Sequence, residues 1–163
     1  MSYPPPRYSG DRGEVSAAFR PHDHPFELAH ASGGGAAYLA TGAMTRGQFG
    51  LYRWDMGPGV SGPDPHFHRT ISESFLVLSG TVRLYDGTGW VDGTPGDFLF
   101  VPEGGIHAFR NESGEPASML ILFTPGAPRE AYFEAMTEIA TSGRQLSKEE
   151  WTELYRRHDQ YMV

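Results

Sequence analysis

The chain has 163 residues, a formal net charge of −7 at pH 7 and no cysteine. Its length fits a single domain that buries its own apolar core. The lack of cysteine excludes disulfides, thiolate metal sites and a cysteine nucleophile, and the negative charge argues against nucleic acid or an anionic membrane as a partner. No apolar stretch resembles a signal peptide or a membrane span, so we expect a cytoplasmic protein.

Glycine and proline, 21 and 13 residues, are spread along the whole chain, which indicates short strands joined by tight turns. Residues 1–13, with three consecutive prolines, are expected to form an extended arm. Weak strand candidates follow at Glu14–Phe19, Phe26–His30 and Ala36–Thr41. Gln48–Met56 is a stronger candidate because its residues alternate in polarity.

A hairpin is expected further along, because Ser74–Leu78 and Thr81–Tyr85 flank a Ser-Gly turn. The remaining strand candidates are Trp90–Val91, Asp97–Val101, Ile106–Arg110 and Ser118–Phe123. Strands this short and this frequent predict an all-β barrel or sandwich over residues 14–124.

The apolar spacing becomes helical after Pro125. Apolar residues recur at helical intervals across Arg129–Ala140. Ser147 and Glu150 form a capping-box pattern that opens a second helix, which extends to about His158. Residues 125–163 are therefore expected to form two helices that pack on the β body or cap it.

Four residues form a candidate metal site: His66, His68, Glu73 and His107. Residues two apart in a strand point to the same side, so His66 and His68 should face one way. A short bend before Glu73 would return its carboxylate to that side. Imidazole and carboxylate suit one divalent transition metal, and Fe, Ni, Mn, Co, Cu and Zn all remain open.

The same residues lie in two patterns that resemble the motifs of the cupin superfamily. The stretch His66-x-His68-x4-Glu73-x6-Gly80 resembles the first motif, and Gly96-x5-Pro102-x-Gly104-x2-His107-x3-Asn111 matches the second at every fixed position. The glycine expected before the first motif is not found at the usual offset, although Gly59 and Gly62 lie near it. The resemblance implies a jelly-roll-like β-barrel whose mouth holds a metal ion bound by His66, His68, Glu73 and His107.

Other polar residues of these patterns are interpreted as structural. Asn111 is expected to make local hydrogen bonds and not to bind the metal. His22 and His24 also form an H-x-H pair, but flanking prolines indicate a turn and a surface position.

Aromatic and apolar residues are candidates for a substrate pocket next to the metal. They are Tyr52, Trp54, Phe75, Phe98, Phe100, Phe109, Tyr132, Phe133 and Met136. Each of them also fits an ordinary core position. The first predicted helix resembles the helix after the barrel in small quercetin-dioxygenase-like cupins, where it can cap the barrel mouth; a helix packed on the outer sheet is the alternative.

Three functions follow from the resemblance. The first is a metal-dependent dioxygenase that acts on a small phenolic, flavonol-like compound, with Glu73 both binding the metal and accepting the substrate proton. The second is a non-oxidative zinc enzyme, namely a polyketide cyclase, an isomerase or a lyase. The third is a metal- or ligand-binding module without turnover. We expect an apolar or aromatic small molecule as ligand, although the non-oxidative enzyme could also act on a sugar-like substrate, and we expect a homodimer.

Overall fold

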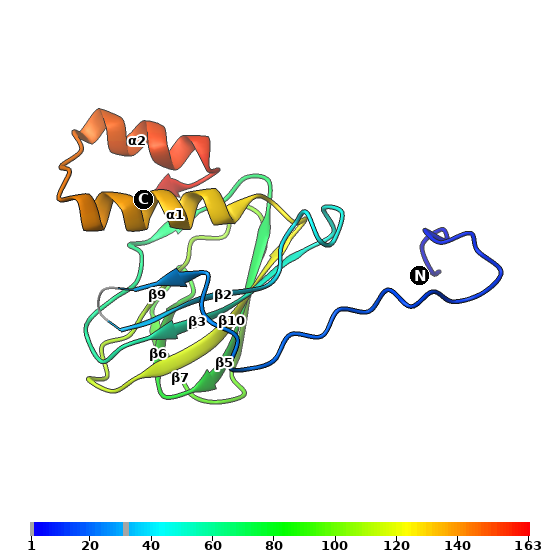
Figure 1. Cartoon of the computed structure of the whole chain (residues 1–163). Coiled ribbons are helices and arrows are strands. Elements are labelled where there is room, and N and C mark those ends of the chain that lie inside the picture. The colour runs from blue at the N-terminus through cyan, green and yellow to red at the C-terminus, as the bar shows by residue number, and fades with distance from the viewer. Residues whose placement is uncertain (1, 31–32) are drawn as a thin grey trace.

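The computed structural model describes residues 2–30 and 33–163, in which β-sheets are followed by two helices (Figure 1). The larger antiparallel sheet has the strand order β1-β2-β3-β10-β5-β8. Its strands are β1 (Leu28–Ala29), β2 (Gly34–Ala40), β3 (Gly50–Met56), β10 (Ala117–Thr124), β5 (Ser72–Ser79) and β8 (Phe98–Val101). A second sheet has the strand order β7 (Trp90–Gly93), β6 (Val82–Tyr85) and β9 (Ala108–Arg110). A third sheet consists of two strands, β11 (Tyr161–Met162) and β4 (His66–Phe67).

The core lies between the sheets because alternate residues of each strand point inward. In β10 every second residue is buried, from Ala117 to Phe123. Buried side chains of the neighbouring strands, including Tyr52 and Phe75, join the same cluster, and Val82 of β6 adds the smaller sheet to it. The predicted all-β class with two helices near the C-terminus is confirmed.

Both predicted helices form, as α1 (Arg129–Ser142) and α2 (Lys148–Arg157). The capping box that opens α2 is present: Ser147 Oγ accepts a hydrogen bond from the Glu150 backbone at 3.2 Å, and the Glu150 carboxylate accepts one from the Ser147 backbone at 2.8 Å. Figure 1 shows both helices at one end of the β body. Among the described residues, no helix combines the length and apolarity that a bilayer crossing requires.

The strand predicted at Glu14–Phe19 does not form. These residues are exposed, and the segment runs away from the β body (Figure 1), so it has no neighbouring strand with which to pair. The chain joins the sheet a few residues later, where the Arg20 guanidinium donates to the Glu27 carboxylate at 2.8 Å. Glu27 in turn accepts a 2.8 Å hydrogen bond from the Tyr38 backbone in β2.

Asn111 ties together the loops at the far end of β9. Its side-chain nitrogen donates to the carbonyls of Gly57 and Glu115, both at 2.8 Å. Its side-chain oxygen accepts hydrogen bonds from the backbone and hydroxyl of Ser113. Because the side chain is fully buried and its polar atoms are satisfied, Asn111 has the local hydrogen-bonding role that its place in the motif indicates.

Replacing Asn111 with alanine should lower the free energy of unfolding by roughly 2–3 kcal/mol, because the carbonyls of the buried Gly57 and of Glu115 lose their donor. Ser113→Ala removes one partner of the same network and should cost about 1 kcal/mol. Urea denaturation of the three proteins measures both differences. Equal stability of Asn111→Ala and the unmodified protein would contradict this role.

Candidate metal centre

Four buried side chains meet at one point of the structure. His66, His68, Glu73 and His107 each offer one ligand atom, and these atoms all lie within 4.8 Å of one another. None of the four residues is more than 5% exposed. The residues that the spacing selected are therefore brought together in space.

Backbone pairing between the two motif segments places His66 opposite His107. The His66 backbone N–H donates to the His107 carbonyl at 3.0 Å, and the reverse hydrogen bond is 2.9 Å long. The next bond along the chain joins the Gly104 N–H to the His68 carbonyl at 2.7 Å. Strand β4 includes only His66 and Phe67, yet the rings of His66 and His68 remain neighbours, with centroids 5.1 Å apart.

Glu73 reaches the cluster from the centre of the larger sheet. It is the second residue of β5, where it lies opposite Phe123 of β10 and Val101 of β8. Its Oε2 oxygen is 3.1 Å from His68 Nε2 and 2.8 Å from His107 Nε2. A carboxylate held between two strands in this way has little freedom to turn away from the imidazoles.

The outer nitrogen of each histidine faces a backbone carbonyl. The Nδ1 atoms lie 2.8 Å from Asp64 O in His66, 2.6 Å from Asp159 O in His68 and 3.0 Å from Gly105 O in His107. A carbonyl only accepts hydrogen bonds, so each Nδ1 carries a hydrogen. In a neutral ring, Nε2 is then left with a free lone pair, which is the form that binds a metal.

The charges of the cluster favour a bound cation. Burial raises the pKa of Glu73, but hydrogen bonds with His107 and His68 outweigh it and hold that pKa well below its usual range, so the carboxylate is ionised. Burial, with the nearby His107, lowers the pKa of His66 to about 3 and keeps that ring neutral. Burial lowers the pKa of His107 too, but its contact with Glu73 outweighs this and raises it. Both nitrogens of His107 thus face acceptors, an arrangement that either a protonated ring or a metal ion at Nε2 satisfies.

Several of the candidate pocket residues form a continuous layer of aromatic rings beside the cluster. Phe75 lies 5.9 Å from His107 and 5.7 Å from Phe109, measured between ring centroids. Phe109 contacts Trp54, and Trp54 contacts Phe133 of α1 with centroids 4.9 Å apart. The others are placed around this layer: Tyr52 packs on Phe133, Tyr132 packs on His158, and Met136 is half-buried against the core.

Phe98 and Phe100 do not belong to this layer and are 62% and 57% exposed. The strand register explains why these two side chains are exposed instead of lining the pocket. Val101 pairs with Glu73, and Leu99 pairs with Phe75, so these two residues of β8 point to the inner side. Phe98 and Phe100 therefore point outward, because neighbouring residues of a strand face opposite sides.

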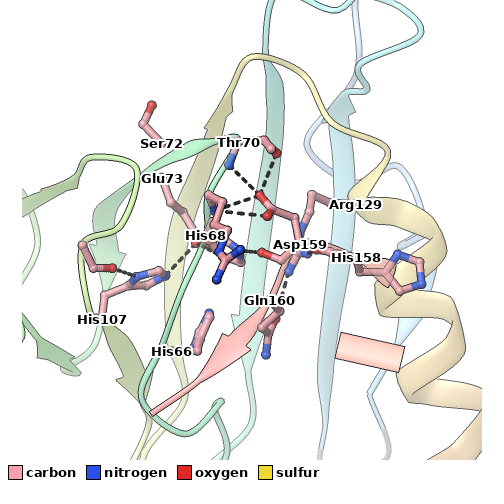
Figure 2. Close-up of polar contacts among 12 residues, drawn as sticks. His66, His68, Thr70, Ser72, Glu73, His107, Arg129, His158, Asp159 and Gln160 are labelled. Carbon is pink, nitrogen blue, oxygen red and sulfur yellow. Dashed lines mark hydrogen bonds and ion pairs between the residues drawn. The ribbon is translucent and has the colours of Figure 1, made fainter. Parts of the chain in front are cut away.

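A segment that the sequence analysis did not select, His158–Val163, lies directly against the cluster. Figure 2 shows Asp159 beside His68, with Arg129 and Gln160 next to it. The buried Arg129 guanidinium donates to the His158 carbonyl at 2.7 Å and to Gln160 Oε1 at 3.2 Å. One signal could have drawn attention to Arg129: a cation in the first turn of a helix opposes the helix dipole and needs another reason to be there.

The central part of the chain is similar to proteins of a known family. Residues 52–123 match the family model described as Cupin domain. Germin-like protein 5-1 from Oryza sativa subsp. japonica is 35% identical over 74 residues, which are 41% of this chain and 32% of the rice protein. An uncharacterized protein from Aquifex aeolicus (strain VF5) is 36% identical over 61 residues, 37% of this chain and 50% of that protein. The chain thus spans half or less of the length of these relatives.

A solved structure agrees with this assignment at the level of the fold. KdgF from Halomonas sp. superposes with a TM-score of 0.56 and 17% sequence identity, over 67% of this chain and 94% of the Halomonas chain. All four residues of the cluster lie within the stretch that matches the family model. Residues 52–123 therefore resemble a cupin domain, and they contain a buried His/Glu cluster that could hold a metal ion.

Proposed function

We propose that this chain is a metal-dependent cupin enzyme whose His66, His68, Glu73 and His107 bind one divalent transition-metal ion. The observation that carries the proposal is the orientation of the imidazoles. Each Nδ1 is engaged by a backbone carbonyl, while the three histidines and the Glu73 carboxylate offer ligand atoms that converge within 4.8 Å. Three nitrogens and one carboxylate oxygen form a donor set that suits the divalent transition metals.

We further propose that the reaction is a dioxygenation of a small phenolic compound. The aromatic layer formed by Phe75, Phe109, Trp54 and Phe133 supports this substrate class, because flat rings pack well against other rings. When bound, the metal ion would act as a Lewis acid toward the substrate oxygen.

Within this proposal Glu73 accepts the proton of the substrate hydroxyl. Its carboxylate is ionised because its pKa is held low by the two histidines against the effect of burial. It is also the one carboxylate of the cluster. A buried, ionised carboxylate next to the substrate oxygen can take up that proton as the oxygen becomes anionic.

The protein purified without chelators should contain one equivalent of metal per chain, measured by inductively coupled plasma mass spectrometry. His66→Ala and His107→Ala should each lose most of it, because each removes one of four ligands. His22→Ala, in an exposed turn, is the matched control and should keep the full equivalent. Stoichiometric metal in both His66→Ala and His107→Ala would rule out this ligand set.

Oxygen consumption should accompany turnover when the metal-loaded protein is tested against a panel of flavonols and simpler phenols with an oxygen electrode. Glu73→Gln should lower kcat by about two orders of magnitude or more, since an amide cannot accept the proton. The metal content of that variant is measured in parallel, so that a lost base is distinguished from a lost ion. Turnover of a substrate without oxygen uptake would instead assign the non-oxidative cyclase, isomerase or lyase chemistry.

A further inference from the structure

The segment His158–Val163 covers the candidate metal centre through regular backbone pairing. Strand β11 is antiparallel to β4, with Tyr161 opposite Phe67 and Met162 opposite His66. The Val163 N–H continues this ladder and donates to the Pro65 carbonyl at 3.1 Å. The Tyr161 ring stacks on Phe67, with centroids 5.2 Å apart. The segment is thereby fixed against the same short strand that supplies His66.

Asp159 makes two kinds of contact with the loop that follows β4. Its backbone carbonyl lies 2.6 Å from His68 Nδ1. Its carboxylate accepts hydrogen bonds from the backbone of Arg69 and Thr70, at 3.1 and 2.8 Å, and from the Thr70 hydroxyl at 2.6 Å. Figure 2 shows these contacts on both sides of Asp159. The side chain anchors the turn, and the carbonyl of the same residue is thereby aimed at His68.

The backbone of Asp159 adopts a left-handed conformation, with φ of 55°. Aspartate tolerates this region better than most residues because its short polar side chain can hydrogen-bond locally. The strain of such a conformation persists only where the surroundings hold it in place. Here the hydrogen bonds from Arg69 and Thr70 to the Asp159 carboxylate hold the conformation on one side.

Arg129 holds the segment on the other side. Its guanidinium donates to the His158 carbonyl and to the Gln160 side chain, so the residues before and after Asp159 are both tied to the first turn of α1. The Arg129 side chain is itself buried, over the rings of Tyr132 and Phe123. Asp159 is therefore fixed between α1 and the loop that carries His68.

We propose that Asp159 is a positioning residue of the metal centre. It keeps a hydrogen on His68 Nδ1 and orients the ring so that Nε2 faces Glu73, 3.1 Å away. This inference rests on the proposed metal site, in which His68 is a ligand. Partners that orient a ligand histidine typically change metal affinity by 10- to 100-fold when removed.

The test compares zinc dissociation constants, measured by competition with a chromophoric chelator. Asp159→Ala should weaken zinc binding by roughly 10- to 100-fold. Asp159→Asn should recover most of the affinity, because asparagine tolerates the left-handed backbone and its amide oxygen can accept the same hydrogen bonds. Asp86→Ala is the matched control, since that carboxylate also accepts from two backbone N–H groups and a threonine hydroxyl, in the turn between β6 and β7. It should leave zinc binding unchanged.

Nitrogen-15 spectra of the histidine rings in metal-free protein provide a second readout. Nδ1 of His68 should stay protonated in the unmodified protein and exchange between tautomers in Asp159→Ala. Unchanged zinc affinity in Asp159→Ala would overturn the positioning role, as would a loss of affinity that Asp159→Asn does not recover. If the unmodified protein binds no zinc, the proposed metal site fails, and an unchanged His68 spectrum in Asp159→Ala would then overturn the positioning role by itself.

Discussion

The antiparallel pairing of the His66 and His107 backbones is the constraint on which the site depends. Two reciprocal hydrogen bonds of about 3 Å fix these residues opposite each other, although they lie far apart in the sequence. Side chains of directly paired residues project from the same face of the two strands. The positions of these two imidazoles are therefore determined by main-chain hydrogen bonds, and the side chains of His68 and Glu73 have only to reach that point.

The rest of the cluster is oriented by a shell of carbonyl groups. Asp64, Gly105 and Asp159 each present a carbonyl to one histidine, so the inner nitrogens point toward Glu73. Two of these carbonyls lie two residues from the histidine that they orient, and their geometry is local. The third comes from the far end of the sequence, so the complete shell forms only when the segment after α2 packs against β4.

The convergence of His66, His68, Glu73 and His107 could be predicted from the sequence, because their spacing is a property of the strands and loops that carry them. The local hydrogen-bonding role of Asn111 could also be predicted, from its place in the second motif. Phe98 and Phe100 are pocket candidates by sequence but are exposed in the structure. Alternation tells which residues share a face but not which face is inside, and the register with Glu73 decides that. Asp159 could not be predicted, since its contact with His68 uses a backbone carbonyl that every residue possesses.

The position of residue 163 has a practical consequence for how the protein is handled. Val163 is hydrogen-bonded to Pro65, next to His66, so residues fused after it would emerge beside the cluster. A polyhistidine tag attached after residue 163 would bring extra imidazoles close to His66 and strain the β11–β4 pairing. Residues 2–18 are exposed and lead away from the β body (Figure 1). A tag at that end would keep its own histidines away from the cluster, so it would not interfere with metal binding there.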